Sequence, residues 1–210
     1  MTIFHRFLKY IFGFSRRIYY LYGGGNRIKG IKHLSHSLLL FGKNNSIDIR
    51  SRLPKDVKVV IYGNNHKLVI EENVTFKEGQ IWFEDYSCEM IIKSGTTIEN
   101  AELSVAEQGT KLIIGKDCML SKDIHIATTD SHSIIDMESG KRTNIAQDII
   151  INNHVWVGHG VSINKGVSIG ENSVIAARSV VTKSIPDHSI AAGIPAKVVK
   201  TKMNWDRTRI

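Results

Sequence analysis

A β-branched aliphatic residue occupies every sixth position across residues 151–181. The set consists of Ile151, Val157, Ile163, Ile169, Ile175 and Val181. Neither the 3.6-residue period of an α-helix nor the two-residue alternation of a flat strand produces this spacing. Six-residue repeats are instead typical of the parallel β-helix, in which each short strand forms one side of a coil. The spacing therefore predicts a three-sided prism with about 18 residues per turn and turns stacked about 4.8 Å apart.

A second, 22-residue period precedes these hexads. The segments 67–76, 89–98 and 111–120 align without gaps, and each starts 22 residues after the one before. This period corresponds to one 18-residue turn with a bulge of about four residues. The segments 41–49 and 62–70 are also similar to each other, which places the first turn near Leu38. We therefore expect one all-β solenoid over residues 38–200, stabilised by contacts between neighbouring turns.

The six-residue register is interrupted once. After Ile126 the next aliphatic position falls on His132, and the register resumes only at Ile151. Roughly nineteen residues must therefore leave the prism, and we expect residues 128–148 to form an extruded loop. Loops of this length in a regular fold are usually functional or disordered. This loop contains several chemically capable side chains, namely Asp130, His132, Asp136 and Arg142.

The N-terminal residues 1–25 differ in composition from the rest of the chain. Apolar residues recur at three- and four-residue steps, which predicts a basic, aromatic-rich amphipathic helix ending at Gly23–Gly25. Lys9, Arg16 and Arg17 interrupt any apolar run long enough to span a bilayer, and no signal-peptide cleavage site follows. Such a helix could cap the solenoid, pack on a neighbouring subunit, or lie on an anionic membrane through residues 1–22. Residues 201–210 are expected to form a C-terminal tail.

Charge and cysteine content narrow the choice of partners and compartment. The formal net charge is +8, which favours an acidic glycan, a phosphate-bearing cofactor or an anionic membrane. Nucleic acid is not expected, because the basic residues are dispersed without an aromatic-interleaved motif. Cys88 and Cys118 are far apart and predict no disulfide framework, which fits the reducing cytoplasm.

Four segments of the chain carry a family resemblance. They are "IGKDCM" at residues 114–119, "TDSH" at 129–132, "HVWVG" at 154–158 and "AAGIPAKVVK" at 191–200. Together with the hexads, they make residues 38–200 resemble the hexapeptide-repeat acyltransferases, in particular bacterial capsule O-acetyltransferases of the polysialic acid O-acetyltransferase kind. The resemblance implies a left-handed β-helix, a homotrimer with active sites between adjacent subunits, and acetyl-CoA as co-substrate.

The same resemblance implies two principal site residues. His132 matches the catalytic base, which takes the proton from a sugar hydroxyl as that hydroxyl attacks the thioester carbonyl. A backbone carbonyl or Asp130 would orient the imidazole. Trp156 matches a tryptophan beside the thioester end of the cofactor, and its position next to an inward aliphatic predicts that its side chain faces outward.

The resemblance also implies contacts along the length of the cofactor. Ala177 and Thr182 match positions that meet the pantetheine arm. Lys197 and Lys200, helped by Lys183, stand where the family has basic residues that reach the phosphates. The alternative for these lysines is that they are ordinary solvated surface charges.

Two further positions are less certain matches. His159 stands near the expected pantetheine, where some relatives have a small polar residue, so its role is a departure from the family pattern. Asn100 aligns, within one residue, with a polar contact to the acceptor, although an ordinary turn asparagine is the favoured interpretation.

Other functions compete with O-acetyl transfer. The γ-class carbonic anhydrases share the hexads and the "GIPAKVV" tail, and the five-residue spacing of His154 and His159, with His125 or His132, would suit a zinc site. Trp156 between the two histidines and the long loop argue against this alternative, so no metal is expected. A non-catalytic scaffold and an N-acetyltransferase of an amino sugar are the remaining alternatives.

The expected reaction is therefore acetylation of a hydroxyl of an acidic capsular polysaccharide. Because acetyl-CoA is a cytoplasmic metabolite, we expect the enzyme in the cytoplasm, either free or peripheral at the inner face of the membrane.

Overall fold

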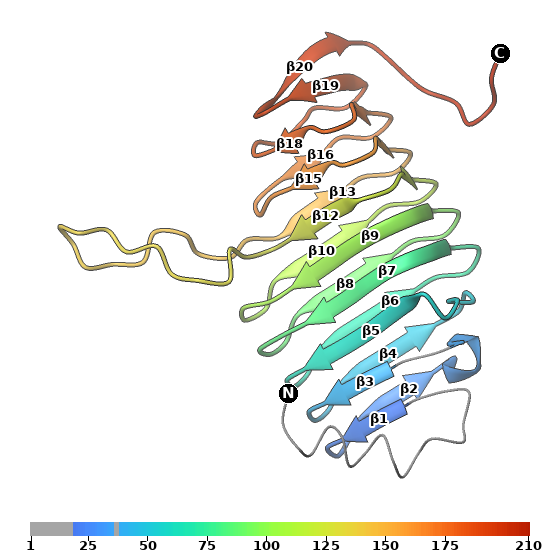
Figure 1. Ribbon diagram of the computed structural model, residues 1–210, viewed down its shortest axis with the longest axis vertical. Coiled ribbons are helices and arrows are strands. Elements are labelled where there is room, and N and C mark those ends of the chain that lie inside the picture. Colours follow the sequence, from blue (N-terminus) through green and yellow to red (C-terminus); the bar gives the residue numbers. More distant parts are fainter. Residues whose placement is uncertain (1–18, 36–37) are drawn as a thin grey trace.

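The computed structural model describes residues 19–35 and 38–210, which form a parallel β-solenoid (Figure 1). Its elements in chain order are β1 (Tyr19–Tyr22), β2 (Arg27–Lys29), the 3₁₀-helix η1 (Ile31–His33), β3 (Leu38–Phe41), β4 (Ser46–Ile49), β5 (Val57–Tyr62), β6 (Lys67–Ile70), β7 (Thr75–Phe83), β8 (Glu89–Ile92), β9 (Thr97–Val105), β10 (Lys111–Ile114), β11 (Met119–Leu120), β12 (Ile124–Ala127), β13 (Ile149–Ile151), β14 (Trp156–Val157), β15 (Ser162–Ile163), β16 (Ser168–Ile169), β17 (Val174–Ile175), β18 (Val180–Val181), β19 (Ser189–Gly193) and β20 (Ala196–Thr201). Among the described residues, no helix is long and apolar enough to cross a membrane.

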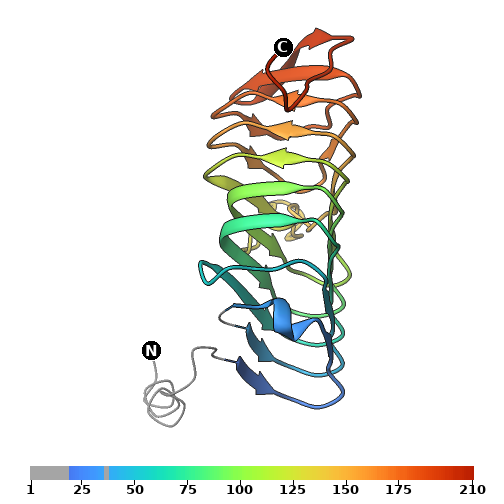
Figure 2. The same cartoon turned by 90° about the vertical axis from the view of Figure 1, so that its right-hand side faces the viewer.

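The strands line three faces of a prism. Face 1 is the parallel sheet of β2, β4, β6, β8, β10, β13 and β16. Face 2 begins with the first residues of β7 and β9 and continues through β11, β14, β17 and β19. Face 3 contains β1, β3 and β5, the last residues of β7 and β9, and then β12, β15 and β18. Figure 2 shows the turns stacked along the long axis.

The predicted aliphatic positions form the core. Each of the six residues in the hexad series has a fully buried side chain: Ile151, Val157, Ile163, Ile169, Ile175 and Val181. Parallel pairing sets equivalent aliphatics directly above one another, as in the column Ile126, Ile163 and Val181 on face 3. Each such side chain contributes roughly 1.5–3 kcal/mol by leaving water. The prediction of a three-sided β-solenoid is confirmed.

The start of the solenoid was predicted too late. Residues 1–18 of the expected N-terminal helix lie outside the described residues, but Tyr19–Tyr22 form strand β1, which pairs in parallel with β3. A helix extending to Gly23–Gly25 is therefore wrong over this segment, and the coil includes residues well before Leu38. The spacing of the apolar residues predicted a helix because it carries no information about strand pairing, and this segment pairs in parallel with β3.

A repeated corner explains why β1 belongs to the coil. Gly23 follows β1 at φ +116°, and a Cβ there would lie 2.0 Å from the carbonyl oxygen of Gly42, the corresponding corner glycine of the next turn. Three residues on, the side-chain oxygen of Asn26 accepts a hydrogen bond from the backbone N–H of Asn45, and Asn45 does the same for His66. The corners thus stack as regularly as the strands, which fixes the register of the first turns.

The extruded loop is present at the predicted position. β12 ends at Ala127 and β13 begins at Ile149, so residues 128–148 lie between the two strands. The loop projects sideways from the prism (Figure 1) and folds on itself through an antiparallel bridge between Ile135 and Arg142. Ile149 then pairs with Leu112 of β10, so the coil resumes in register after the excursion.

The coil ends in a hairpin and a returning tail. β19 and β20 pair antiparallel, which closes the last turn with a strand of opposite direction. Residues 202–210 then descend along the side of the prism that is opposite the loop (Figures 1 and 2). Cys88 and Cys118 are free and buried. Burial raises the pKa of the Cys118 thiol to about 11, so this thiol stays protonated at neutral pH.

Candidate active site

The base of the loop is tied to the coil by an arginine–carboxylate pair. Arg142 donates to both carboxylate oxygens of Glu107, from Nη1 at 2.7 Å and from Nη2 at 2.6 Å. The hydroxyl of Thr129 also donates to Glu107. The hydrogen bond from Arg142 is the main cause that lowers the pKa of Glu107, and the bond from Thr129 adds to it. Bidentate geometry makes this pair stronger and more directional than a single contact.

A second anchor holds the segment that carries His132. The Nδ2 of Asn144 donates to Asp130 Oδ2 at 2.8 Å and to the carbonyl oxygen of His132 at 2.7 Å. Lys165, from the next turn of the coil, donates to Asp130 and, at 3.0 Å, to the carbonyl oxygen of Asn144. The bonds from Lys165 and then Asn144 lower the pKa of Asp130. The backbone of His132 is therefore held in place by groups that are themselves fixed.

The imidazole of His132 is open to solvent. Its side chain is exposed, and no hydrogen bond joins the ring to any residue of the described ranges. Asp130, expected as one possible orienter, instead directs its carboxylate to Lys165 and Asn144. Beside the loop base lies a hollow of about 320 Å³ lined in part by His125, Asp130 and Lys165.

Trp156 lies on face 2, in β14, between Met119 and Val174 of the adjacent turns. Its side chain points outward as predicted and is 39% exposed, while its neighbour Val157 is buried in the core. The indole borders a hollow of about 440 Å³ that is also lined by Thr97, Met119 and Arg207. A flat apolar surface with a free edge is thus available to a ligand on this face.

The two principal residues lie on different parts of one chain. The loop with His132 leaves at the corner between faces 3 and 1, which we call the loop corner, whereas Trp156 lies on face 2. In Figure 1 the loop projects to one side, and the tail that contacts Trp156 descends on the other. A single chain therefore does not bring His132 and Trp156 together.

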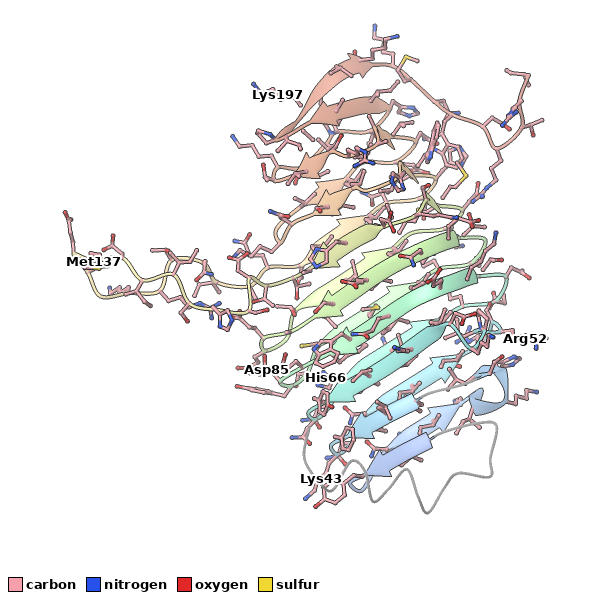
Figure 3. The ribbon with its side chains drawn as sticks, viewed as in Figure 1. Lys43, Arg52, His66, Asp85, Met137 and Lys197 are labelled. Carbon is pink, nitrogen blue, oxygen red and sulfur yellow. The ribbon has the colours of Figure 1, made fainter. Side chains whose placement is uncertain are left out.

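The other predicted residues lie at the loop corner, on face 2 and at the corner between faces 2 and 3. Thr182 and Lys183 follow β18 at the loop corner, and Figure 3 shows Lys197 on the same side of the molecule as Met137 of the loop. Lys200 pairs with Ile190, which continues face 2. The remaining three residues, Asn100, His159 and Ala177, share the corner between faces 2 and 3.

Comparisons with known proteins agree with this architecture. Residues 148–183 match the family model described as bacterial transferase hexapeptide (six repeats). The chain is 44% identical over 119 residues, or 57% of its length, to the polysialic acid O-acetyltransferase of Escherichia coli O1:K1. It is 39% identical over 129 residues, or 61% of its length, to the enzyme of that name from Neisseria meningitidis. These matches span 38% and 59% of the lengths of the two relatives.

Solved structures extend the likeness to nearly the whole chain. The crystal structure of the polySia specific acetyltransferase NeuO superposes with a TM-score of 0.82 at 36% identity, covering 92% of this chain and 90% of that one. The polysialic acid O-acetyltransferase OatWY superposes with a TM-score of 0.82 at 32% identity, covering 92% and 93%. The chain belongs to the hexapeptide-repeat acetyltransferases. Its coil is the left-handed parallel β-helix of this family, which confirms the resemblance seen in the sequence.

The alternative zinc site is not favoured by the arrangement of this hexapeptide-repeat protein. His154 Nδ1 lies 2.8 Å from Asp117 Oδ2, and its Nε2 lies 3.0 Å from the carbonyl oxygen of Trp205. Both ring nitrogens are therefore engaged. His159 lies 3.6 Å from Asp123, and the described ranges contain no group of three side chains placed to hold a metal ion.

Several residues that shape the site were not predicted from the sequence. Glu107, Asn144 and Lys165 fix the loop base, and Trp205 and Arg207 contact the neighbourhood of Trp156. The contact of Lys165 with the loop could have been expected from the sequence, because Lys165 lies in the hexad series at the loop corner. The other contacts depend on the path of the loop or tail and have no signature in the sequence.

The loop base should loosen in acid. A lowered pKa means that the folded chain binds the proton more weakly than the unfolded chain, so the stabilisation from Glu107 and Asp130 is complete above the unfolded pKa of about 4 and is lost as the pH falls through the lowered folded value. Hydrogen exchange of residues 128–148, corrected for intrinsic rates, should show protection that persists to about pH 4 and then disappears while the coil stays protected.

Substitution provides the control for this experiment. Asp130→Asn and Glu107→Gln remove the titrating groups, so they should weaken protection of the loop at pH 7 and flatten its decline in acid. Protection of the wild-type loop that stays constant to about pH 2.5 would contradict the role of these carboxylates.

Proposed function

We propose that this chain transfers the acetyl group of acetyl-CoA to a hydroxyl of an acidic polysaccharide, at active sites formed between the subunits of a homotrimer. The observation that carries the proposal is the likeness over nine-tenths of the chain to a polySia specific acetyltransferase. The names of the relatives favour a hydroxyl acceptor over the amine of an N-acetyltransferase. The net charge of +8 suits an acidic acceptor and a cofactor that carries phosphates.

In the proposed reaction His132 acts as general base. Its imidazole takes the proton of the acceptor hydroxyl as the oxygen attacks the thioester carbonyl, and the resulting imidazolium returns the proton to the departing sulfur of CoA. The acetyl–sulfur bond breaks and an acetyl–oxygen bond forms, so no other reactant is needed. The anchors at Asp130 and Asn144 support this role, because they fix the backbone of His132 and leave the ring free.

In this proposal Trp156 supplies the surface for the thioester end of the cofactor. The remaining contacts would come from both sides of the proposed intersubunit site. Ala177, Thr182 and His159 would lie beside the pantetheine arm, Lys183, Lys197 and Lys200 near the phosphates, and Asn100 near the acceptor. These residues lie at the loop corner, on face 2 and at the corner between faces 2 and 3, which supports a ligand that lies between two copies of the chain.

The separation of His132 and Trp156 within one chain supports a site that a second copy completes. In a closed threefold ring, the loop of each copy can reach face 2 of the next, and all three sites are then equivalent. The exposed apolar side chains of the loop support this packing. Met137 is 95% exposed, and Ile134, Ile135 and Ile145 are also exposed, which is unfavourable for an isolated chain in water.

Two substitutions separate the proposed roles. His132→Ala should lower kcat by about 10²- to 10⁴-fold, because the general base is lost, while the KM for acetyl-CoA changes little. Trp156→Ala should instead raise that KM. Initial rates with acetyl-CoA and an acidic capsular glycan provide the measurement, and His33→Ala, at the far end of the coil, is the matched control. Full activity of both site variants would exclude this assignment of residues.

Mixed trimers test whether the site lies between subunits. Chains carrying His132→Ala and chains carrying Trp156→Ala are each defective, but a mixed trimer contains one interface with both residues intact. Random assembly at equal amounts should restore about a quarter of the wild-type sites, measured as specific activity above the two parents at an acetyl-CoA concentration well below the KM of the Trp156→Ala parent. If His132 and Trp156 of one chain act together, mixing restores nothing.

We further propose that residues 1–18 hold the enzyme at the inner face of the membrane, near the supply of acetyl-CoA and growing glycan. This segment lies outside the described residues, and the proposal rests on its basic and aromatic composition. Vesicles with anionic lipid should bind the full chain in a salt-dependent manner and should not bind a chain lacking residues 1–18. Equal binding of the two chains would refute the proposal.

A further inference from the structure

The last residues of the chain form a strap along the corner between faces 1 and 2, at the edge of face 2. We call residues 202–210 the C-terminal strap. It leaves the end of β20 and descends along the coil (Figures 1 and 2). The backbone N–H of Met203 donates to the carbonyl oxygen of His188 at 2.8 Å, which fixes the point of departure. The strap contains no helix or strand, so side-chain contacts must hold it in place.

Trp205 is the principal contact of the strap. Its side chain is only 8% exposed, although it lies in an irregular tail. The indole stacks on His154 with ring centres 4.3 Å apart and planes within 9° of parallel. Its Nε1–H donates to the carbonyl oxygen of His154 at 2.8 Å, while the imidazole of His154 meets the carbonyl oxygen of Trp205. His154 and Trp205 are therefore joined by two contacts, each between the side chain of one residue and the backbone carbonyl oxygen of the other.

Arg207 holds the strap to the turn of the coil that precedes the turn of His154. Its Nε donates to Asp117 Oδ1 at 2.9 Å, Nη1 to Thr97 Oγ1 at 2.9 Å and Nη2 to the carbonyl oxygen of Cys118 at 2.9 Å. Burial acts to raise the pKa of Asp117, but the hydrogen bonds from His154 and Arg207 outweigh it, and the pKa is lowered. Because the donors of Arg207 are already engaged by the protein, this side chain serves as a clamp and not as a ligand for an anion.

Both contacts converge on Trp156. His154, which Trp205 covers, lies two residues before Trp156, and the rings of Trp205 and Trp156 are 6.1 Å apart at an angle of 47°. This spacing lies within the range of favourable aromatic pairs. Arg207 and Trp156 line the same hollow on face 2. The partly exposed indole of Trp156 is thus bordered by the strap on one side and open to the hollow on the other.

We propose that the strap is a positioning element for Trp156, with Trp205 and Arg207 as its positioning residues. The proposal rests on the role assigned to Trp156 in binding acetyl-CoA. An outward indole on a β-face has several rotamers available. Trp205 occupies the space that some of these rotamers need, so the open edge of Trp156 is presented in one orientation. Fixing a binding group in advance reduces the entropy that the ligand must otherwise remove on binding.

The test compares variants of the strap by their kinetic constants. Trp205→Ala should raise the KM for acetyl-CoA about tenfold and change kcat less than about twofold, because binding depends on the orientation of Trp156 while proton transfer depends on His132. Trp205→Phe keeps an aromatic ring and should recover most of the loss. Arg207→Ala should act in the same direction. Arg209→Ala, in the same tail, is the control and should leave both constants unchanged.

A double-mutant cycle separates positioning from a general loss of stability. Within the Trp156→Ala background, Trp205→Ala should have no further effect on KM, since the group that it positions is gone. The near-ultraviolet circular dichroism of the coupled indole pair should be lost equally in either single variant. A Trp205→Ala effect of the same size in both backgrounds would mean that the strap acts through the fold and would overturn the proposal.

The outcomes also distinguish this proposal from the proposed function. If Trp156→Ala leaves the KM for acetyl-CoA at the wild-type value, then the role assigned to Trp156 fails and the positioning role falls with it. If Trp156→Ala raises the KM and Trp205→Ala does not, the proposed function stands and only the positioning role is overturned.

Discussion

The parallel pairing of each strand with its equivalent one turn away is the interaction on which the rest of the structure depends. In the described part of the chain it provides backbone hydrogen bonds between successive turns, and it sets equivalent aliphatic positions above one another in the core. A prism built in this way is filled by its own side chains and leaves no interior space for a substrate. The chemistry must therefore be carried on the outside, on faces and corners or on segments that leave the coil. The loop at residues 128–148 and the C-terminal strap are the two such segments that the described residues contain.

Both segments are attached to the coil by the same kind of anchor. A carboxylate near the coil surface, Glu107 for the loop and Asp117 for the strap, receives hydrogen bonds from an arginine of the excursion. An aromatic or amide side chain then completes each anchor. Among the described residues, no fully buried side-chain nitrogen or oxygen lacks a hydrogen-bond partner. Irregular segments make few strand-pairing hydrogen bonds. A few directional, charge-assisted hydrogen bonds fix their position without the burial of a large surface.

The sequence predicts what the repeat controls and little else. The inward positions from Ile151 to Val181 and the bounds of the loop were predicted correctly, because one slip of register would move every aliphatic out of the core. The first turn was missed, because the helical spacing of residues 1–25 concealed the repeated glycine and asparagine of the corners at Gly23 and Asn26. Asn144 and Trp205 were missed for another reason. Their partners are brought close by irregular backbone, and no period in the sequence records where that backbone goes.

The stacking of the coil also bears on how a site can be completed. Parallel pairing joins each turn to the next along the faces of the prism, so the faces themselves act as a fixed support. His132 and Trp156 lie on separate parts of the chain, at the loop corner and on face 2. In the proposed trimer a neighbouring copy supplies the missing face at the height of the loop. The exposed apolar loop tip around Met137 and the open side of Trp156 would then meet across one interface. On the same proposal, the strap beside Trp156 in one copy would set the geometry met by the imidazole of the next.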